Sequence, residues 1–260
     1  MTGKDPSNWY SERDIATTFV KGLHVLSAFH DEQARITLPE IVASTGFDRA
    51  TTRRLVATLV DSGYVEKHGR QFALTSKVLT FAGSYLRGTS VGTAIQPVLN
   101  RYSKKLGRDI SYARLADDAV VYVAQSHGRN SQVSFGFTIG SRLPLLHTAL
   151  GRALLAAEDQ NTANELIEGV EFTQFCSGTL MDRAAIQQEV ITARDQGYAL
   201  VSNEFENGIS GLAVSVGRYG SRKGVVGFSA PTSEFRNKKS LLNDVSVLQE
   251  CAQEIDRSGQ

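Results

Sequence analysis

Three arginines, Arg49, Arg53 and Arg54, stand close together in a stretch that holds no acidic residue from Arg49 to Val60. A guanidinium group donates hydrogen bonds in a planar fork, which suits phosphate oxygens and the edge of a guanine base. Such an acid-free, cationic surface can enter the major groove of DNA without repelling the phosphates. The alternative is an ordinary solvated helix face, which is the more frequent case for an isolated segment.

The residues around these arginines have the pattern of two short helices joined by a turn. We predict a first helix over about 39–45 with Pro39 in its first turn, and a tight turn at Gly46. Asp48 has the side chain of an N-cap for a second helix. Helical spacing gives that helix an inward face of Thr52, Leu55, Val56 and Leu59. Its outward face collects Ala50, Thr51, Arg53, Arg54, Ala57 and Thr58.

A two-stranded hairpin is predicted after the second helix. Residues 64–67 and 71–74 alternate apolar and polar side chains, and His68-Gly69-Arg70 separates them. Lys67 and Arg70 then lie at the tip, where a basic wing adds phosphate or minor-groove contacts. Upstream, an apolar helical pattern predicts a scaffold helix whose core-facing residues are Phe19, Leu23, Leu26 and Phe29.

Together these segments predict a winged helix-turn-helix that binds duplex DNA, over residues 10–75. The candidate DNA-binding residues are Arg49, Ala50, Thr51, Thr52, Arg53, Arg54, Lys67 and Arg70. From Arg49 to Arg70, five basic residues stand against Asp61 and Glu66, a local excess of three positive charges. The whole chain has a net charge of only +1, so its DNA affinity must rest on this local surface.

Length and composition favour two domains without cofactors. The 260 residues, 41% of them hydrophobic, can bury two modest cores. Cys176 and Cys251 lie far apart and have no CxxC or Cys/His spacing, so neither a disulfide framework nor a metal site is indicated. No apolar run approaches a membrane span, and the polar first residues lack the apolar core of a signal peptide. We therefore expect a cytoplasmic protein.

A connector and a second, α+β domain are predicted downstream. Residues 76–86 have helical apolar spacing and meet a loop-like breaker at 87–92, so we assign 76–90 to a connector and 91–258 to the second domain. A helix over about 93–106 contains Pro97 near its first turn or at a kink. Further helices are predicted at about 148–157, 182–196 and 241–255. Strand-like segments are 110–116, 119–125, 132–138, 198–203, 211–217 and 224–230.

No catalytic set is apparent in the second domain. His147 stands beside Thr148, but adjacent residues seldom present both groups to one reacting atom, and a third orienting group is missing. The nucleophile-elbow, zinc-protease and P-loop patterns are also missing. We therefore do not expect an enzyme.

The start of the helix predicted near Thr148 is better suited to binding than to catalysis. Free backbone N–H groups at Thr148, Ala149, Leu150 and Gly151 would converge on one spot, which favours a carboxylate. We expect Gly151 to let a ligand approach the backbone closely. Arg142 and Arg152 are candidate counter-ions, although a surface or interdomain salt bridge is the alternative for both and the preferred one for Arg152.

The chain resembles the IclR family of bacterial transcriptional regulators, within it the branch that controls aromatic-acid catabolism. The segments that carry the resemblance are FVKGLHVLSAF, LPEIVASTGFDRATTRRLVATLVDSGYV, GRQFALTSKVL, VVYVAQ, IGSRLPLLHTALGRALLA and NEFENGISGLAVSV, in this order from about Thr17 to Pro231. The resemblance implies a GAF-like second domain with a central antiparallel sheet and a small carboxylate effector. It places Thr148, Ala149, Leu150, Ser202, Gly211 and Ser229 around the ligand, with Val133, Phe135 and Ile209 as apolar walls.

Four positions depart from the family pattern. Ser202 replaces an aspartate, Gly211 a serine or cysteine, Ser210 an arginine frequent in this branch, and Ser215 a proline. These changes remove charge and bulk, so the branch's substrates are not carried over to this chain.

The mechanism predicted from these features is allosteric control of transcription. A symmetric dimer, for which the resemblance implies a dimer of dimers, would present two recognition helices to operator half-sites about 34 Å or a multiple apart. An effector in the second domain would change their spacing, and RNA polymerase is retained as a candidate partner. The alternatives are a constitutive DNA-binding regulator without an effector and, less favoured, a DNA-tethered enzyme.

Overall fold

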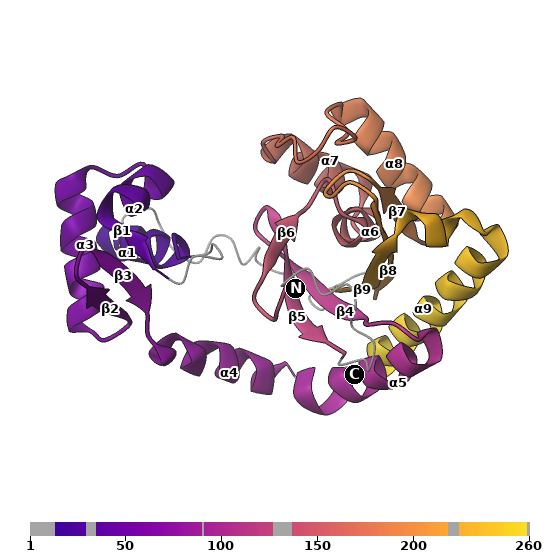
Figure 1. The fold of residues 1–260 in the computed structure, drawn as a ribbon, viewed down its shortest axis with the longest axis horizontal. Helices are drawn as coiled ribbons and strands as arrows, with labels where there is room; N and C mark the ends of the chain where they lie inside the picture. Colours follow the sequence, from indigo (N-terminus) through magenta and orange to yellow (C-terminus); the bar gives the residue numbers. More distant parts are fainter. Residues whose placement is uncertain (1–13, 30–34, 90, 127–136, 218–223, 259–260) are drawn as a thin grey trace, which may run out of the picture. The chain divides into compact units, whose positions relative to one another are not determined.

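The computed structural model describes residues 14–29, 35–89, 91–126, 137–217 and 224–258 (Figure 1). Contacts between Cα atoms divide the chain into two compact units, Met1–Tyr85 and Leu86–Gln260. We describe each unit by itself. Among the described residues, no helix has the length and apolar character needed to cross a membrane.

Three helices and a small antiparallel sheet lie within the described part of residues 14–74 of the first unit. The helices are α1 Thr17–Ser27, α2 Leu38–Thr45 and α3 Arg49–Asp61. The sheet has the order β1-β3-β2, with β1 Ile36–Thr37, β2 Val65–His68 and β3 Gln71–Leu74. These elements confirm the predicted winged helix-turn-helix. Strand β1 was not predicted, because two residues are too few to show an alternating pattern.

Two glycines make the turns of this unit. Gly46 ends α2 with φ at 69°, and Gly69 lies in the hairpin turn with φ at 63°, a region that side chains other than glycine rarely adopt. The pairing of His68 with Gln71 leaves Gly69 and Arg70 as the two turn residues. The turn is therefore one residue shorter than the predicted His68-Gly69-Arg70.

The apolar face of α1 is only partly buried, which corrects the prediction. Val25 is fully buried and Ala28 is 6% exposed, whereas Phe19 and Leu23 are 68% and 47% exposed. Leu26 packs against the core but is only partly buried. Because α2 and α3 cover only the stripe through Val25, the start of the predicted core face is open to solvent.

The connector is helical over a longer stretch than predicted. A 3-10 turn, Ser76–Val78, leads into α4, Leu79–Gly88. The segment predicted as a loop-like breaker ends in a π-helical turn, Val91–Ile95, whose Val91 and Ile95 are buried in the core of the second unit. Helix α5, Gln96–Leu106, follows with Pro97 in its first turn, as predicted.

A six-stranded antiparallel sheet organises the second unit and confirms the α+β prediction. Its order is β6-β5-β4-β9-β8-β7. The strands are β4 Ser111–Ala116, β5 Ala119–Gln125, β6 Arg142–Pro144, β7 Ala199–Ser202, β8 Ile209–Val216 and β9 Gly224–Pro231. The helices are α5, α6 Ala149–Ala157, α7 Gln160–Gly169, α8 Arg183–Gln196 and α9 Lys238–Ser258.

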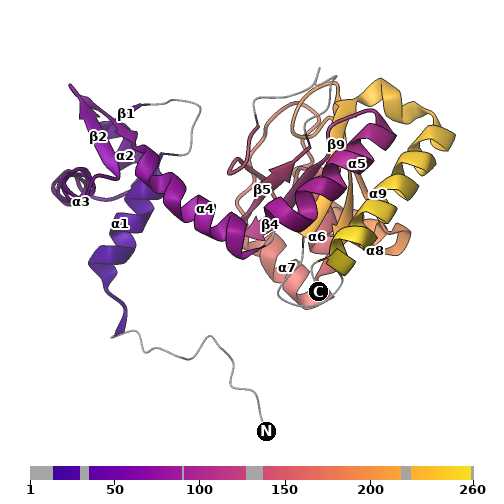
Figure 2. The same cartoon turned by 90° about the horizontal axis from the view of Figure 1, so that it is seen from below.

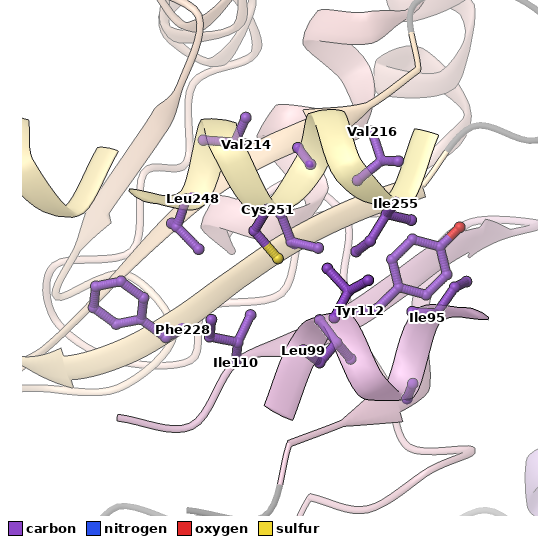
Figure 3. Packing of buried hydrophobic residues seen from close by; sticks show 14 of the residues in the cluster. Ile95, Leu99, Ile110, Tyr112, Val214, Val216, Phe228, Leu248, Cys251 and Ile255 are labelled. Atoms are coloured by element: carbon purple, nitrogen blue, oxygen red, sulfur yellow. The ribbon is translucent and has the colours of Figure 1, made fainter. Parts of the chain in front are cut away.

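Helices cover both faces of this sheet. On one face α5 and α9 lie side by side (Figure 2), and Leu99 of α5 meets Leu248 and Cys251 of α9 above the strands (Figure 3). On the other face α6 and α8 pack against alternate strand residues such as Ala113 and Ala213. Since successive strand residues point to opposite faces, strands such as β4 and β5 contribute to both cores.

Further differences from the sequence-based prediction lie in the second unit. Strand β6 and helix α7 were not predicted, and α9 begins earlier and ends later than the predicted 241–255. The strand predicted over 132–138 falls mostly outside the described residues, and the described Phe137 and Thr138 are not in a strand.

Candidate functional site

Helix α3 is held by its N-cap and presents its basic face to solvent. The Asp48 carboxylate accepts a hydrogen bond from the Thr51 N–H at 2.9 Å, and hydrogen bonds from Thr51 lower the pKa of Asp48. Arg49, Arg53 and Arg54 are all exposed. Within the described part of the chain, none of these three arginines forms a salt bridge, so their guanidinium groups are available to a ligand.

The structure removes Thr52 from the DNA-facing set. Its side chain is fully buried, and its hydroxyl donates to the Asp48 carbonyl oxygen at 3.0 Å. Leu55, Val56 and Leu59 are buried with it, which confirms the predicted inward stripe. Ala50 is exposed and Thr51 is half-buried on the opposite side.

The wing presents its two predicted basic side chains to solvent. Lys67 and Arg70 are exposed near the turn of the β2-β3 hairpin. His68 lies 2.8 Å from Glu66, measured from Nε2 to a carboxylate oxygen. Successive residues of a strand point to opposite faces, so the Lys67 side chain lies on the other face of β2 from Glu66 and His68.

A cavity of about 440 Å³ lies in the second unit, at the beginning of α6. Six of the predicted effector residues line it: Thr148, Ala149, Leu150, Ile209, Gly211 and Ser229. Val133 and Phe135 fall outside the described residues. The cavity therefore brings together the start of α6 and the facing ends of β8 and β9, as the resemblance implied.

The first turn of α6 offers hydrogen-bond donors to this cavity. Thr148 is the N-cap, and its hydroxyl oxygen accepts from the Gly151 N–H at 3.1 Å while donating to the Pro144 carbonyl at 2.7 Å. The N–H groups of Ala149 and Leu150 have no acceptor within the helix, since they belong to its first turn. Both residues line the cavity, so the positive end of the helix dipole faces it.

Gly151 has a packing role, which corrects its predicted contact with the ligand. A Cβ atom at Gly151 would lie 1.9 Å from the Leu145 carbonyl oxygen, and Gly151 does not line the cavity. The glycine instead lets α6 pack directly on the backbone of the preceding segment. Gly211 is different, because a Cβ there would meet Ala149 at 3.1 Å and the Ser229 oxygen at 3.7 Å, inside the cavity wall.

Ser202 also lies away from the cavity, contrary to the prediction. Its hydroxyl oxygen accepts a hydrogen bond from the Ser210 hydroxyl at 2.7 Å, and the residue is exposed. Val201 lines the cavity, so the alternation of β7 turns Ser202 to the other face of the sheet. Ser210 continues this chain of hydroxyls to Thr232 at 2.9 Å.

Neither of the two predicted counter-ions lines the cavity. Arg142 is exposed and pairs with Asp118 at 2.7 Å. Arg152, for which a surface or interdomain salt bridge was preferred, is 2% exposed and binds the buried Glu204 at 2.6 Å within the second unit. Its Nε also donates to the Leu146 carbonyl at 3.0 Å. The sequence did not indicate this partner of Arg152, because Glu204 is far from Arg152 along the chain and follows a strand.

Glu204 joins Arg152 to His147 in a buried polar cluster. Its carboxylate lies 3.5 Å from Nδ1 of His147. Burial by itself raises the pKa of Glu204, but the hydrogen bond to His147 and the charge and hydrogen bond of Arg152 outweigh it and lower the pKa. Thr179 donates to the Glu204 carbonyl at 2.7 Å, so this residue is fixed through both side chain and backbone.

The cluster fixes part of the cavity wall and does not resemble a catalytic triad. Glu204, Phe205 and Glu206 line the cavity, and Glu204 anchors this segment to α6 through Arg152. The Thr148 hydroxyl is bonded to Pro144, away from the His147–Glu204 contact. Sequence reasoning missed the cluster because its members come from separate elements.

Arg108 is a cationic residue of the cavity that sequence reasoning also missed. It lines the cavity, pairs with Glu234 at 2.9 Å and stacks 4.7 Å above the Phe228 ring. Asp109 and Glu234 also line the cavity. The charge of Arg108 is thus already offset by a neighbouring carboxylate.

The described residues contain no group of three or more His, Cys, Asp or Glu side chains arranged to hold a metal. Both cysteines are free thiols. Cys251 is fully buried between α9 and the sheet (Figure 3), and burial raises its pKa to about 12.

Comparison with known proteins agrees with this architecture. Residues 18–69 match the IclR helix-turn-helix domain, and residues 83–257 match the C-terminal domain of bacterial IclR transcriptional regulators. The Pca regulon regulatory protein of Pseudomonas putida is 33% identical over 78% of this chain and 70% of its own length. The p-hydroxybenzoate hydroxylase transcriptional activator of Acinetobacter baylyi is 30% identical over 78% of this chain and 76% of its own length.

A solved structure shares the fold of the whole chain. An IclR homologue from Microbacterium hydrocarbonoxydans, crystallised with 4-hydroxybenzoate, superposes with a TM-score of 0.71 at 20% identity and covers 93% of this chain and 98% of its own. The two regulators named above fit the resemblance to the aromatic-acid branch, and they are transcriptional regulators, not enzymes. With both domains matched in order, this chain belongs to the IclR family of bacterial transcriptional regulators.

Proposed function

We propose that this regulator binds operator DNA through α3 and the wing as a symmetric oligomer, and that a small carboxylic acid in the cavity controls the binding. The observation that carries the effector half is the cavity at the first turn of α6, which is lined by Ala149, Leu150 and Ser229. The DNA half rests on the exposed arginines of α3. Each half has its own experiment.

For DNA, we assign base and phosphate contacts to the exposed face of α3. This face contains Arg49, Ala50, Thr51, Arg53 and Arg54. Small residues beside the arginines let the helix approach the base edges closely. Lys67 and Arg70 of the wing would add backbone contacts, which position the protein without reading sequence. Selection of bound duplexes from a random library, followed by binding titration against a scrambled duplex, tests the assignment.

For assembly, exposed apolar side chains of the first unit support a second copy of the chain as partner. Phe19 and Leu23 of α1 are accompanied by Leu79 and Phe81 of α4, which are 65% and 61% exposed. Isolated exposed apolar residues are common, but several large ones on two helices favour a protein contact. Sedimentation of wild type and Phe19→Asp tests this: we expect a dimer or a dimer of dimers for the wild type and smaller species for the variant.

For the effector, the cavity suits an acid with a modest apolar body. Its apolar walls include Ile209, Phe228 and Leu143, and the backbone N–H groups at the start of α6 are among its donors. A ligand that binds only the folded state raises the unfolding midpoint. A thermal-shift screen of aromatic and short aliphatic carboxylates should therefore give stabilising members.

A blocked cavity supplies the control for this screen. Ser229→Leu places a larger side chain beside Gly211 and Ala149, and it should abolish the shift while leaving operator binding intact. Shifts of equal size in wild type and Ser229→Leu would place the ligand elsewhere. A flat response of the wild type to every acid would favour the alternative, a constitutive regulator without an effector.

A further inference from the structure

Three hydrogen bonds connect the end of helix α3 to the segment that begins the connector. The Lys77 ammonium donates to the Ser62 carbonyl oxygen at 2.8 Å, and the Thr75 hydroxyl donates to the Gly63 carbonyl oxygen at 2.7 Å. The Thr75 N–H donates to the Tyr64 carbonyl oxygen at 2.9 Å. Because β2 and β3 separate its two sides in the sequence, this is a tertiary contact and not a local turn. We call it the joint, and its residues are 62–64 and 75–77.

The joint supplies donors to carbonyl groups that α3 cannot satisfy by itself. The last carbonyls of an α-helix have no partner inside the helix, and they form the negative end of its dipole. Ser62 is the C-cap of α3, and Gly63 follows with φ at 77°, so the chain leaves the helix at this point. The Lys77 ammonium at Ser62 therefore satisfies a carbonyl and also lies at the end of α3 where a positive charge is stabilising.

An aromatic ring holds the Lys77 ammonium from a second side. Its Nζ lies 4.5 Å from the centre of the Tyr64 ring, within the range of a cation–π contact. The Tyr64 ring stacks on Phe81 of α4, with centroids 5.6 Å apart and planes inclined by 19°. The Lys77 carbonyl oxygen accepts a hydrogen bond from the Thr80 hydroxyl at 2.8 Å. Lys77 is therefore bound to the start of α4 through its backbone and to the end of α3 through its side chain.

The joint lies between the helix with the DNA-facing arginines and the helix that leads to the second unit. Helix α4 follows β3 through the 3-10 turn (Figure 1), and it continues in the sequence past Tyr85, the last residue of the first unit. Since α3 and the start of α4 are bonded to the same few residues, a rotation of the start of α4 carries α3 with it. The joint thus fixes the orientation of α3 relative to the connector.

Resting on the proposed function, we infer that Lys77 is a positioning residue for operator recognition, which fixes α3 to the connector so that the two recognition helices of a symmetric oligomer match one spacing of half-sites. Lys77 acts through α3 and does not itself contact the DNA. Without this bond, the orientation of each α3 has to be ordered when both helices dock, and the ordering cost is subtracted from the binding free energy. A looser joint also lets the helices reach half-sites at other spacings.

A series of duplexes with different half-site spacings tests this inference. Each duplex contains two copies of the half-site selected from the random library, at the selected spacing or with base pairs added between them, and one further duplex contains a single half-site. Adding about five base pairs moves the second half-site to the opposite side of the double helix, since one turn takes about 10 base pairs. Fluorescence anisotropy with the full-length protein gives the Kd for each duplex. We expect the wild type to bind most tightly at the selected spacing and to lose affinity steeply at the others.

Lys77→Met keeps the length of the side chain but removes its donor and its charge. We expect its Kd at the selected spacing to rise about 3- to 10-fold, the size of one net hydrogen bond, with the Kd for the single half-site unchanged. The loss of affinity at other spacings should be smaller than in the wild type. Lys77→Arg should restore the wild-type spacing profile, because a guanidinium group can also donate to a carbonyl and lie over a ring. Thr75→Val, which removes the other side-chain bond of the joint, should act like Lys77→Met.

Lys21→Met is the matched control. Lys21 is also an exposed lysine of the first unit, and its ammonium lies 5.7 Å from the centre of the Phe47 ring, but it is not part of the joint. Its loss should leave the shape of the spacing profile unchanged, and thermal melting of each variant checks that it is folded.

Two results would overturn the positioning role of Lys77 while leaving the proposed function intact. One is a spacing profile of Lys77→Met that equals that of the wild type. The other is an equal loss of affinity on every duplex together with a lower salt slope, which would make Lys77 a phosphate contact. A wild type that prefers no spacing, and binds two half-sites no better than one, would overturn the symmetric oligomer of the proposed function and this inference together.

Discussion

Replacing Arg152 by methionine should destabilise the second unit strongly, because it leaves a buried carboxylate without its cation. Glu204 is 8% exposed, and its carboxylate receives the Arg152 guanidinium at 2.6 Å. Removing one partner of a buried ion pair typically costs about 3 to 5 kcal/mol. The same substitution leaves the Leu146 carbonyl without the Nε donor at 3.0 Å, which adds to the loss.

Thermal unfolding of the full-length protein, followed by circular dichroism, measures the effect. For a domain of this size, about 1 kcal/mol shifts Tm by roughly 2 to 4 °C, so we expect Arg152→Met to lower the Tm of the second unit by roughly 6 to 20 °C. The double variant Arg152→Met with Glu204→Gln should recover part of the loss, because no uncompensated charge stays buried. The lowered pKa of Glu204 means that the stabilisation is complete above the unfolded value of 4.5 and is lost as the pH falls.

Arg194→Met is the matched control for helix arginines. Arg194 also donates to backbone carbonyls, those of Ala156 and Glu158 at 3.1 and 3.0 Å, but no described carboxylate forms a salt bridge with it. Its loss should be clearly smaller than that of Arg152. If Arg152→Met costs no more than Arg194→Met, or if the double variant is less stable than the single one, the buried ion pair is not what holds Glu204 in place.

Four further predictions concern separate parts of the chain. Arg53→Ala should reduce the difference in binding free energy between operator and scrambled DNA by about 1 to 3 kcal/mol. Lys67→Ala should instead lower the slope of log affinity against log salt concentration by about one and leave the sequence preference unchanged. Fluorescence anisotropy titration at several salt concentrations checks both. Gly151→Ala should impair folding of the second unit and not merely effector response, since its Cβ would lie 1.9 Å from a carbonyl oxygen, and a wild-type melting curve would contradict this. Burial raises the pKa of Cys251 to about 12, so the contribution of this thiol to stability is complete below the unfolded value of 9.0 and is lost as the pH rises toward 12. Cys251→Ala should therefore lose less stability between pH 9 and 12 than the wild type does. An unchanged alkaline profile would count against the burial argument.

Local patterns in the sequence predict the first unit well because its elements are short and contiguous. Asp48, the stripe through Leu55 and the turn glycine Gly46 act on residues within a few positions of themselves. The prediction failed at Phe19 and Leu23, since an apolar spacing shows that a face is to be covered but not whether this chain or another copy covers it. A second copy of the chain would account for both observations.

The cavity shows where such local patterns stop being sufficient. Thr148 and its helix can be recognised from a cap followed by an apolar run, and strand alternation is visible in β8 and β9. Which face each strand turns toward α6 depends on register, and register placed Ser229 in the cavity but Ser202 on the opposite side. Arg152 illustrates the same limit. The sequence-based prediction preferred a surface or interdomain salt bridge for this residue, whereas its partner Glu204 is buried and belongs to a segment far away in the sequence. Pairing across the sheet, not the local sequence, therefore decides which of the polar residues near α6 meet a ligand and which only hold the wall that surrounds it.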